Sequence, residues 1–168
     1  MAAYDFLSQW FIDAPIGRVF SAIQDAPSWP SWWKAVTRLD VLDHGGPDGI
    51  GSVTRCEWRS ALGYKLTFDA RVTRSAPPRL IEVIATGELV GLGRWTLLPE
   101  SAGTLVEYRW RVATTKRWMN ALTPVLRPAF HYNHTIVMRW GGEGLGRLLG
   151  ARFEDRSGIA RDARLSRS

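Results

Sequence analysis

Cysteine is almost absent from this sequence, because Cys56 is the only one in 168 residues. A single cysteine excludes an intrachain disulfide framework and a zinc site built from cysteine pairs. No run of about 18 consecutive apolar residues occurs, so the sequence predicts no membrane-spanning helix. The first fifteen residues also lack the basic and apolar regions of a signal peptide. We therefore expect a cytoplasmic protein without an integral membrane segment.

Lysine is scarce as well, and arginine carries almost all of the net charge of +6. Four arginines lie in residues 156–168, a stretch without apolar periodicity. We predict a single domain over residues 1–152, followed by a basic, disordered tail over residues 153–168. Without that tail the remaining charge is modest, so nucleic-acid binding through a basic face is not expected.

Tryptophan is abundant, with nine residues, while the hydrophobic content of 45% and the charged content of 23% are ordinary for a soluble globular domain. Large aromatic rings suit the walls of a ligand cavity, because they offer wide apolar contact with few rotamers. They suit a filled core equally well. The tryptophan count alone therefore leaves both interpretations open.

Alternating polar and apolar residues predict a first strand over residues 4–12. Two short helices are expected in residues 13–35, and a long helix over residues 128–150. The segments between them alternate and are joined by short turns, which is typical of antiparallel neighbours. The predicted fold is α+β: a curved antiparallel sheet of about seven strands around one long C-terminal helix, with two short helices after the first strand.

The alternation also predicts which strand residues face inward, since a sheet covered on one side buries every second side chain. The predicted inward set is Cys56, Trp58, Leu66, Phe68, Ala70, Val72, Trp95, Leu97, Val106, Tyr108, Trp110 and Val112.

The long helix carries one mostly apolar stripe. Its members, at three- and four-residue steps, are Phe130, His134, Val137, Met138, Gly141, Leu145 and Leu148. Four glycines between residues 141 and 146 thin this helix, although an interior glycine costs roughly 1 kcal/mol relative to alanine. We interpret them as leaving room for an apolar ligand between helix and sheet. The alternative is close helix packing through the glycines, with no cavity.

Several segments resemble the polyketide cyclase/dehydrase-like branch of the START-like (SRPBCC, helix-grip) superfamily. The resemblance covers roughly residues 4–149, and its segments are IDAPIGRVFSAIQD, PSWPSWW, GIGSVTRC, APPRLIEV, GTLVEYRW and GLGRLLG. It implies a deep apolar cavity between a concave sheet and the C-terminal helix. Relatives bind lipids, sterols, quinones or polyketide intermediates, and some catalyse cyclisation or dehydration. No shared set of catalytic residues can be carried over, so the resemblance is a weak argument for an enzyme.

The residues expected to line the cavity are Trp58, Phe68, Trp95, Tyr108, Trp110, Asn133, His134, Val137 and Met138. Within the cavity, His134 and Asn133 are predicted to form hydrogen bonds with a ligand carbonyl or hydroxyl. The alternative is a histidine satisfied by a backbone carbonyl or by water. A metal site is not expected, because His131 and His134 lack an evident third ligand. No cofactor is expected either.

The leading hypothesis is binding or transport of an apolar small molecule such as a lipid, quinone or polyketide-like compound. A cyclase or dehydratase using the same cavity is the first alternative, with His134 and Tyr108 as candidate acid/base groups. Glu82 or Glu88 would join them if their strand faced the cavity.

The second alternative is a protein-interaction module. Three tryptophans within residues 29–33 are more than one short helix is expected to bury, so they could line the cavity entrance or dock on a membrane or a partner protein. The alternative is ordinary packing of two of the rings, with the third half exposed. The glycine-rich loop at residues 45–51 is interpreted as a flap over the cavity mouth or as a plain connection. A homodimer is permitted by the sequence but not required.

Overall fold

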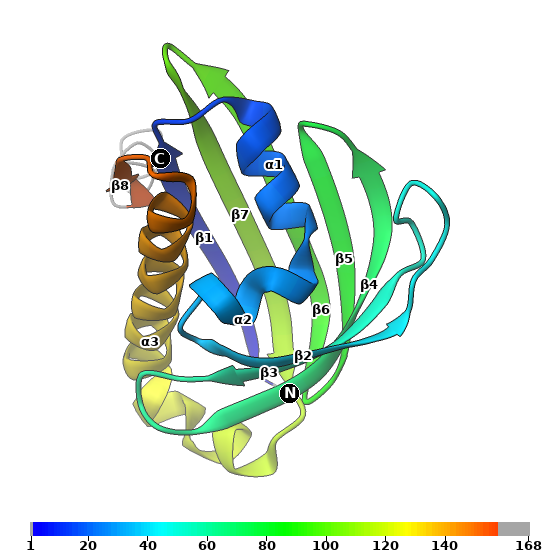
Figure 1. The fold of residues 1–168 in the computed structure, drawn as a ribbon. Coiled ribbons are helices and arrows are strands. Elements are labelled where there is room, and N and C mark those ends of the chain that lie inside the picture. The colour runs from blue at the N-terminus through cyan, green and yellow to red at the C-terminus, as the bar shows by residue number, and fades with distance from the viewer. Residues whose placement is uncertain (1, 158–168) are drawn as a thin grey trace, which may run out of the picture.

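The computed structural model of the chain describes residues 2–157. Its core element is an eight-stranded antiparallel sheet with the strand order β2-β3-β4-β5-β6-β7-β1-β8 (Figure 1). The strands are β1 (Ala3–Ile12), β2 (Val36–Asp43), β3 (Val53–Arg59), β4 (Lys65–Ala76), β5 (Leu80–Gly87), β6 (Leu89–Glu100), β7 (Gly103–Thr114) and β8 (Phe153–Asp155). The helices are α1 (Ile16–Gln24), the 3-10 helix η1 (Ala26–Ser28), α2 (Trp29–Trp32) and α3 (Arg117–Leu149).

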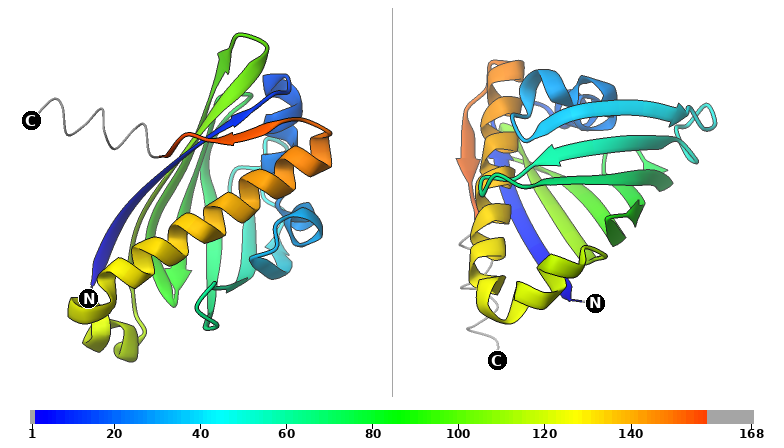
Figure 2. Two further views of the ribbon diagram at one scale, coloured as in Figure 1. Left: turned by 90° about the vertical axis from the view of Figure 1, so that its left-hand side faces the viewer. Right: turned by 90° about the horizontal axis from the view of Figure 1, so that it is seen from below.

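The sheet curves, and all helices lie on its concave side (Figures 1 and 2). The long α3 runs along the part of the sheet that contains β1, while α1 and α2 cover the part in front of β5 to β7. One buried cluster joins side chains of α1, α2 and α3 to the inner face of the sheet. The predicted α+β helix-grip architecture is confirmed, with eight strands in place of about seven.

The additional strand, β8, lies in the segment that we predicted to be a disordered tail. Residues 153–155 pair antiparallel with β1, with Phe153 opposite Ile12. The prediction was wrong for these residues because three residues are too few to show alternation. Arg156, counted as a tail charge, donates to Glu100 at 2.6 Å and lies over the Phe11 ring. The rest of the predicted tail, residues 158–168, lies outside the described residues.

The long helix begins earlier than predicted. Helix α3 starts at Arg117 and continues through Pro124 and Pro128, and Figure 2 shows it turning sharply in this first part. Such a bend is expected, because each proline lacks the N–H for an i→i−4 bond and its ring clashes with the preceding turn. At the other end the predicted stripe is wrong at Leu148, which is 49% exposed. The four-residue step from Leu145 leads instead to Leu149, which packs against the core.

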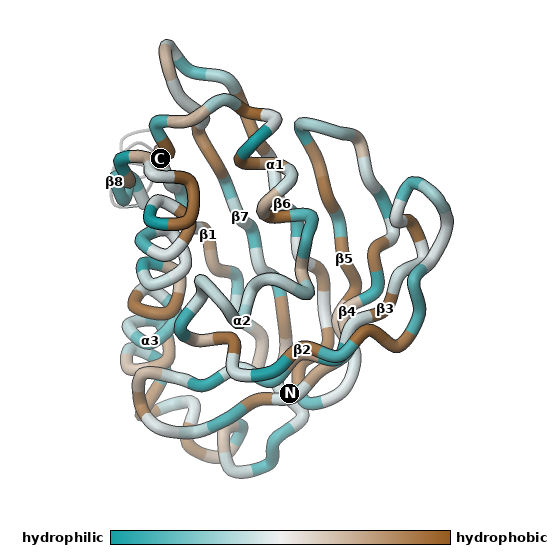
Figure 3. The backbone as a smooth tube through the Cα atoms, in the orientation of Figure 1, coloured by the Kyte–Doolittle hydropathy of each residue, from teal (hydrophilic) through white to brown (hydrophobic). Residues whose placement is uncertain are grey.

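The inward face of the sheet follows the predicted alternation. Every member of the predicted inward set is buried or half-buried. Ion pairs cover the outer face: Arg55 meets Asp69 at 2.7 Å across β3 and β4, and Lys65 meets Glu57 at 2.9 Å. Figure 3 shows the corresponding exchange of polar and apolar residues along the strands. One face of the sheet is therefore apolar and available to build a core or a cavity.

Candidate ligand-binding cavity

Two pockets lie between the concave face of the sheet and the elements that cover it. The first, which we call the helix pocket, has a volume of about 110 Å³ and is bounded by α3 from Met119 to Met138. The second, the loop pocket, has a volume of about 420 Å³ and is bounded by α1, η1 and the loop after β2. Four side chains line both of them: Trp58, Phe68, Tyr108 and Trp110. The two pockets are therefore adjacent lobes with a common aromatic wall.

The common wall is built from strands β3, β4 and β7. Its rings contact one another in sequence, with centroid distances of 6.4 Å for Trp58 and Phe68, 5.7 Å for Phe68 and Trp110, and 5.8 Å for Trp110 and Tyr108. Trp95 extends the stack at 4.1 Å from Tyr108. The two-residue period of the strands puts these rings on one face, and the register of neighbouring strands brings them together.

All nine predicted cavity residues lie in the walls of these lobes. Asn133, His134, Val137 and Met138 line the helix pocket, Trp95 lines the loop pocket, and the other four line both. Their role in ligand binding remains a prediction. The prediction missed the contribution of β1, whose Tyr4 and Phe6 line the helix pocket. Their alternation was visible in the sequence, but only the pairing of β1 with β7 brings them to the cavity.

Both polar atoms of the Asn133 amide form hydrogen bonds within the protein, so the amide is not free for a ligand. Its Oδ1 accepts from the Ala61 backbone N–H at 2.7 Å, and its Nδ2 donates to the Tyr64 hydroxyl at 3.2 Å. These bonds tie the β3–β4 turn to α3. Burial, with nearby Tyr4, raises the pKa of Tyr64 to about 12, so this phenol stays neutral.

His134 lies in the wall of the helix pocket, where its ring stacks on Phe6 with a centroid distance of 4.0 Å. Tyr108 contributes a second polar group to this pocket. Burial raises its pKa well above the ordinary value, so its hydroxyl is a permanent hydrogen-bond donor. The buried Nε1 of Trp58 has no hydrogen-bond partner within residues 2–157. The aromatic wall therefore carries one buried donor without an acceptor, in addition to the Tyr108 hydroxyl.

Carboxylates are missing from the helix pocket among the described residues. Glu82 pairs with Arg94 at 2.9 Å, and Glu88 pairs with Lys116 at 2.7 Å, so neither joins Tyr108 and His134. Between residues 2 and 157 there is also no group of three His, Cys, Asp or Glu side chains that could hold a metal ion. Cys56 lies in the loop pocket, where burial raises its pKa and keeps it a thiol.

The glycines of α3 do not create the cavity, contrary to our interpretation. A Cβ at Gly141 would overlap the Trp33 ring, one at Gly142 would overlap the Phe153 ring, and one at Gly144 would overlap the Trp32 carbonyl oxygen. The alternative of close packing is therefore correct for this half of the helix. The cavity lies against the preceding half, which carries full-sized side chains.

The tryptophans of residues 29–33 are not a surface cluster. Trp33 is fully buried, Trp32 is 7% exposed and Trp29 is half-buried. The Nε1 of Trp33 donates to the Val137 carbonyl at 2.9 Å. The alternative of two packed rings and one half-exposed ring is correct, because α2 lies between the sheet and α3 and is therefore covered on two sides. The docking surface required by the interaction-module hypothesis is therefore absent at these residues.

The loop after β2 lies where a flap would lie. Asp43 at the end of β2 and the loop residues His44, Gly46, Pro47, Asp48 and Gly49 line the loop pocket. Its glycines at positions 45, 49 and 51 have positive φ angles, which glycine adopts at little cost. Movement of the loop remains a prediction.

Comparison with known proteins gives the same architecture. The family model described as "Polyketide cyclase / dehydrase and lipid transport" matches residues 8–144. The chain belongs to this family. Among curated proteins, none matches the chain. No helix in residues 2–157 combines the length and the apolar character needed to cross a membrane.

Solved structures of low sequence identity share the family's fold. The di-domain ARO/CYC protein BexL, from the BE-7585A biosynthetic pathway, is 20% identical with a TM-score of 0.69. The match covers 89% of this chain and 51% of BexL, so the chain spans about half of that protein. The protein TTHA0849 from Thermus thermophilus is 19% identical with a TM-score of 0.69, over 84% of this chain and 97% of that one. Ara h 8.0201 is 12% identical with a TM-score of 0.57, over 86% and 99%.

Proposed function

We propose that this protein binds an apolar small molecule in the two lobes, as a carrier or receptor for a lipid, quinone or polyketide-like compound. The observation that supports this most is the common aromatic wall, which faces both lobes with wide apolar surfaces and carries the unpaired Nε1 donor of Trp58. Pockets of this composition suit mostly apolar ligands with one or two oxygen acceptors. Membership of a family described by lipid transport and polyketide cyclisation supports the same proposal.

Native mass spectrometry of freshly purified protein tests the proposal directly. We expect the folded protein to carry a bound mass, and solvent extraction to release an apolar compound that identifies the ligand class. Purified protein that carries no bound compound and also fails to bind lipids, quinones and aromatic polyketides would contradict the proposed function.

Filling the loop pocket should weaken binding. Ala70 lines this pocket on β4, so Ala70→Leu places three additional carbons where a ligand would lie. Because overpacking costs typically 1–3 kcal/mol, we expect the Kd for the neutral fluorescent probe N-phenyl-1-naphthylamine to rise at least about fivefold. Ala76→Leu is the matched control, since Ala76 is exposed on the same strand and lines neither pocket. Equal affinities of the two variants would contradict the pocket assignment.

A cyclase or dehydratase that uses the same cavity is the second candidate. Tyr108 and His134 both line the helix pocket, and a donor beside a titratable imidazole is the minimum for acid/base chemistry. For an enzyme, we expect His134→Ala to abolish turnover of an aromatic polyketide substrate while ligand affinity stays nearly unchanged. Binding without turnover in the unsubstituted protein would favour the carrier.

A further inference from the structure

An exposed apolar patch lies on the first part of α3, where the helix bends. Trp118, Leu122 and Val125 are 42%, 45% and 78% exposed, and their four- and three-residue steps place them on one side of the helix. We call these three residues the bend patch. A surface helix normally turns its apolar side inward and its polar side to water. Here three large apolar side chains face water, and packing within residues 2–157 does not account for their exposure.

Polar side chains help to hold the inner side of this segment to the sheet. Thr123 is buried, and its hydroxyl lies 2.9 Å from the Tyr4 hydroxyl on β1. The Asn120 amide donates to the Thr114 carbonyl at 3.0 Å and accepts from the Ala2 backbone N–H at 2.7 Å. The segment is therefore anchored from its inner side, and the bend patch is available to a partner outside the chain.

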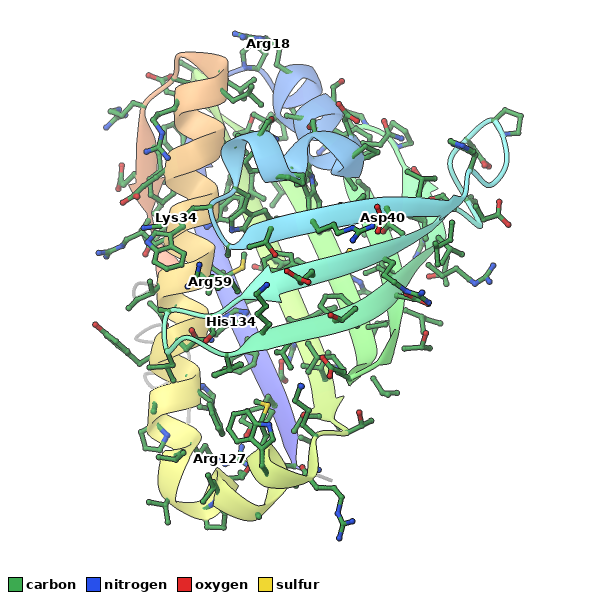
Figure 4. The ribbon with its side chains drawn as sticks, turned by 60° about the horizontal axis from the view of Figure 1, so that its bottom comes forward. Arg18, Lys34, Asp40, Arg59, Arg127 and His134 are labelled. Carbon is green, nitrogen blue, oxygen red and sulfur yellow. The ribbon has the colours of Figure 1, made fainter. Side chains whose placement is uncertain are left out.

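The charges next to the bend patch are positive. Residues 115–142 contain no aspartate or glutamate, and their basic residues are Lys116, Arg117, Arg127 and Arg139. Arg117 and Arg127 are exposed and flank the patch in the sequence. Figure 2 shows this part of α3 at one end of the molecule, and Figure 4 shows Arg127 at that end, opposite Arg18. An apolar patch with a basic border is complementary to an anionic surface that also admits apolar side chains.

An anionic bilayer fits the bend patch better than a second protein does. A standard protein interface buries about 800 Å² on each partner and involves about 20–30 residues a side. Three apolar side chains are too few for such an interface. A bilayer needs no matching shape, and tryptophan, leucine and arginine on one helix are typical of segments that lie in its interface.

The bend patch lies on the segment of α3 that also bounds the helix pocket. Met119, the neighbour of Trp118, lines that pocket, and so do Tyr64 and Phe130. The Trp118 ring contacts these two rings, with centroid distances of 5.5 Å to Tyr64 and 6.4 Å to Phe130. Contact between the patch and a bilayer therefore brings this end of the helix pocket to the membrane surface.

We propose that this protein docks on anionic membranes through the bend patch, with Arg117 and Arg127 against the lipid headgroups, and exchanges its apolar ligand with the bilayer at the helix pocket. The docking depends on the patch and its charges alone. The exchange rests on the proposed function, because it needs a ligand in the cavity.

Sedimentation with sucrose-loaded vesicles tests the docking. We expect the full chain to bind vesicles made of three parts phosphatidylcholine to one part phosphatidylglycerol. Vesicles of phosphatidylcholine alone should bind at least about tenfold more weakly, because each basic residue near an anionic surface strengthens binding about fivefold. Equal binding to the two kinds of vesicle would refute the part of the basic residues.

Leu122→Ser should weaken binding to the anionic vesicles about fivefold, since serine removes an apolar side chain from the lipid interface. Leu148→Ser is the matched control, because Leu148 lies near the other end of the same helix and is exposed to nearly the same extent, 49%. It should bind like the unsubstituted protein. Thermal unfolding of each variant shows whether the fold is retained.

Arg117→Gln should also weaken binding to the anionic vesicles about fivefold, because it removes one charge from the border of the patch. Arg79→Gln is the matched control, since Arg79 is exposed on the β4–β5 turn, away from α3 in the sequence. Equal binding of these two variants would overturn the role given to Arg117.

Transfer of N-phenyl-1-naphthylamine from the protein to vesicles tests the exchange. We expect the transfer rate to rise with the concentration of anionic vesicles, because the probe then leaves from the docked protein, and Leu122→Ser to reduce this dependence. A rate that does not change with vesicle concentration means release into water and would overturn the exchange.

The outcomes separate the docking from the proposed function. If the protein does not bind anionic vesicles, or if Leu122→Ser and Leu148→Ser bind them alike, the docking is refuted and ligand binding still stands. Self-association that Leu122→Ser abolishes, without vesicle binding, would overturn the docking and assign the patch to a second copy of the chain. Failure to bind the probe in the absence of vesicles would count against the proposed function and leave the docking intact.

Discussion

The substitution Gly144→Ala is expected to lower the free energy of unfolding by about 2–3 kcal/mol. A Cβ at this position would overlap the backbone carbonyl oxygen of Trp32. Backbone atoms cannot rotate away, so α3 and α2 would have to separate. Higher helix propensity returns roughly 1 kcal/mol, which is too little to offset the overlap. Urea denaturation followed by far-UV circular dichroism measures the change.

Gly17→Ala is the control with the opposite expected sign. Gly17 lies in α1, and no atom lies within 4 Å of the Cβ that alanine would add. The substitution should therefore stabilise the protein by up to about 1 kcal/mol. If both substitutions stabilise the protein, the close approach of α3 and α2 at Gly144 is refuted.

The substitution Trp33→Ala is expected to cost about 3–5 kcal/mol, the range for truncating a fully buried large aromatic residue. The Trp33 side chain is fully buried and contacts Trp10 at 5.7 Å and Trp58 at 4.8 Å between ring centroids. Its removal leaves a hole between the sheet, α2 and α3. Denaturant titration should show a large fall in the midpoint, since a stability of about 5–15 kcal/mol is usual for a domain.

Trp118→Ala provides the comparison for this loss. Trp118 is 42% exposed at the start of α3 and contacts Tyr64 at the surface. We expect it to cost about 1 kcal/mol or less. Similar losses for the two variants would mean that the tryptophans of residues 29–33 do not form part of the core.

The strands and their inward faces could be predicted from the sequence because the alternation of polar and apolar residues is a local pattern. A strand with one buried face must alternate, and the residues from Cys56 to Val112 did so without exception in the predicted inward set. The nine predicted cavity residues lie in the walls of the two lobes for the same reason. Local alternation shows which face is inward, although it gives no volume for the space that the face encloses.

The glycines and tryptophans were misread because their meaning depends on what lies opposite. A glycine in a helix means that a side chain is absent at that position. The same absence is compatible with an empty space beside the helix and with the close approach of another segment. Only the fold brings the Trp32 carbonyl oxygen to Gly144 and Phe153 to Gly142. Likewise, the sequence of residues 29–33 shows three large rings but not what covers them. The sheet covers one side of this segment, and α3, more than a hundred residues later in the chain, covers the other.

The sequence by itself determined the element types, the antiparallel order and the inward face, because these depend on periodicity and on turn residues within a few positions. The tertiary structure decided where the cavity lies along α3 and that β8 extends the sheet. Each of these depends on contacts between segments far apart in the chain. Such contacts are fixed by how whole surfaces fit together, so no local pattern records them.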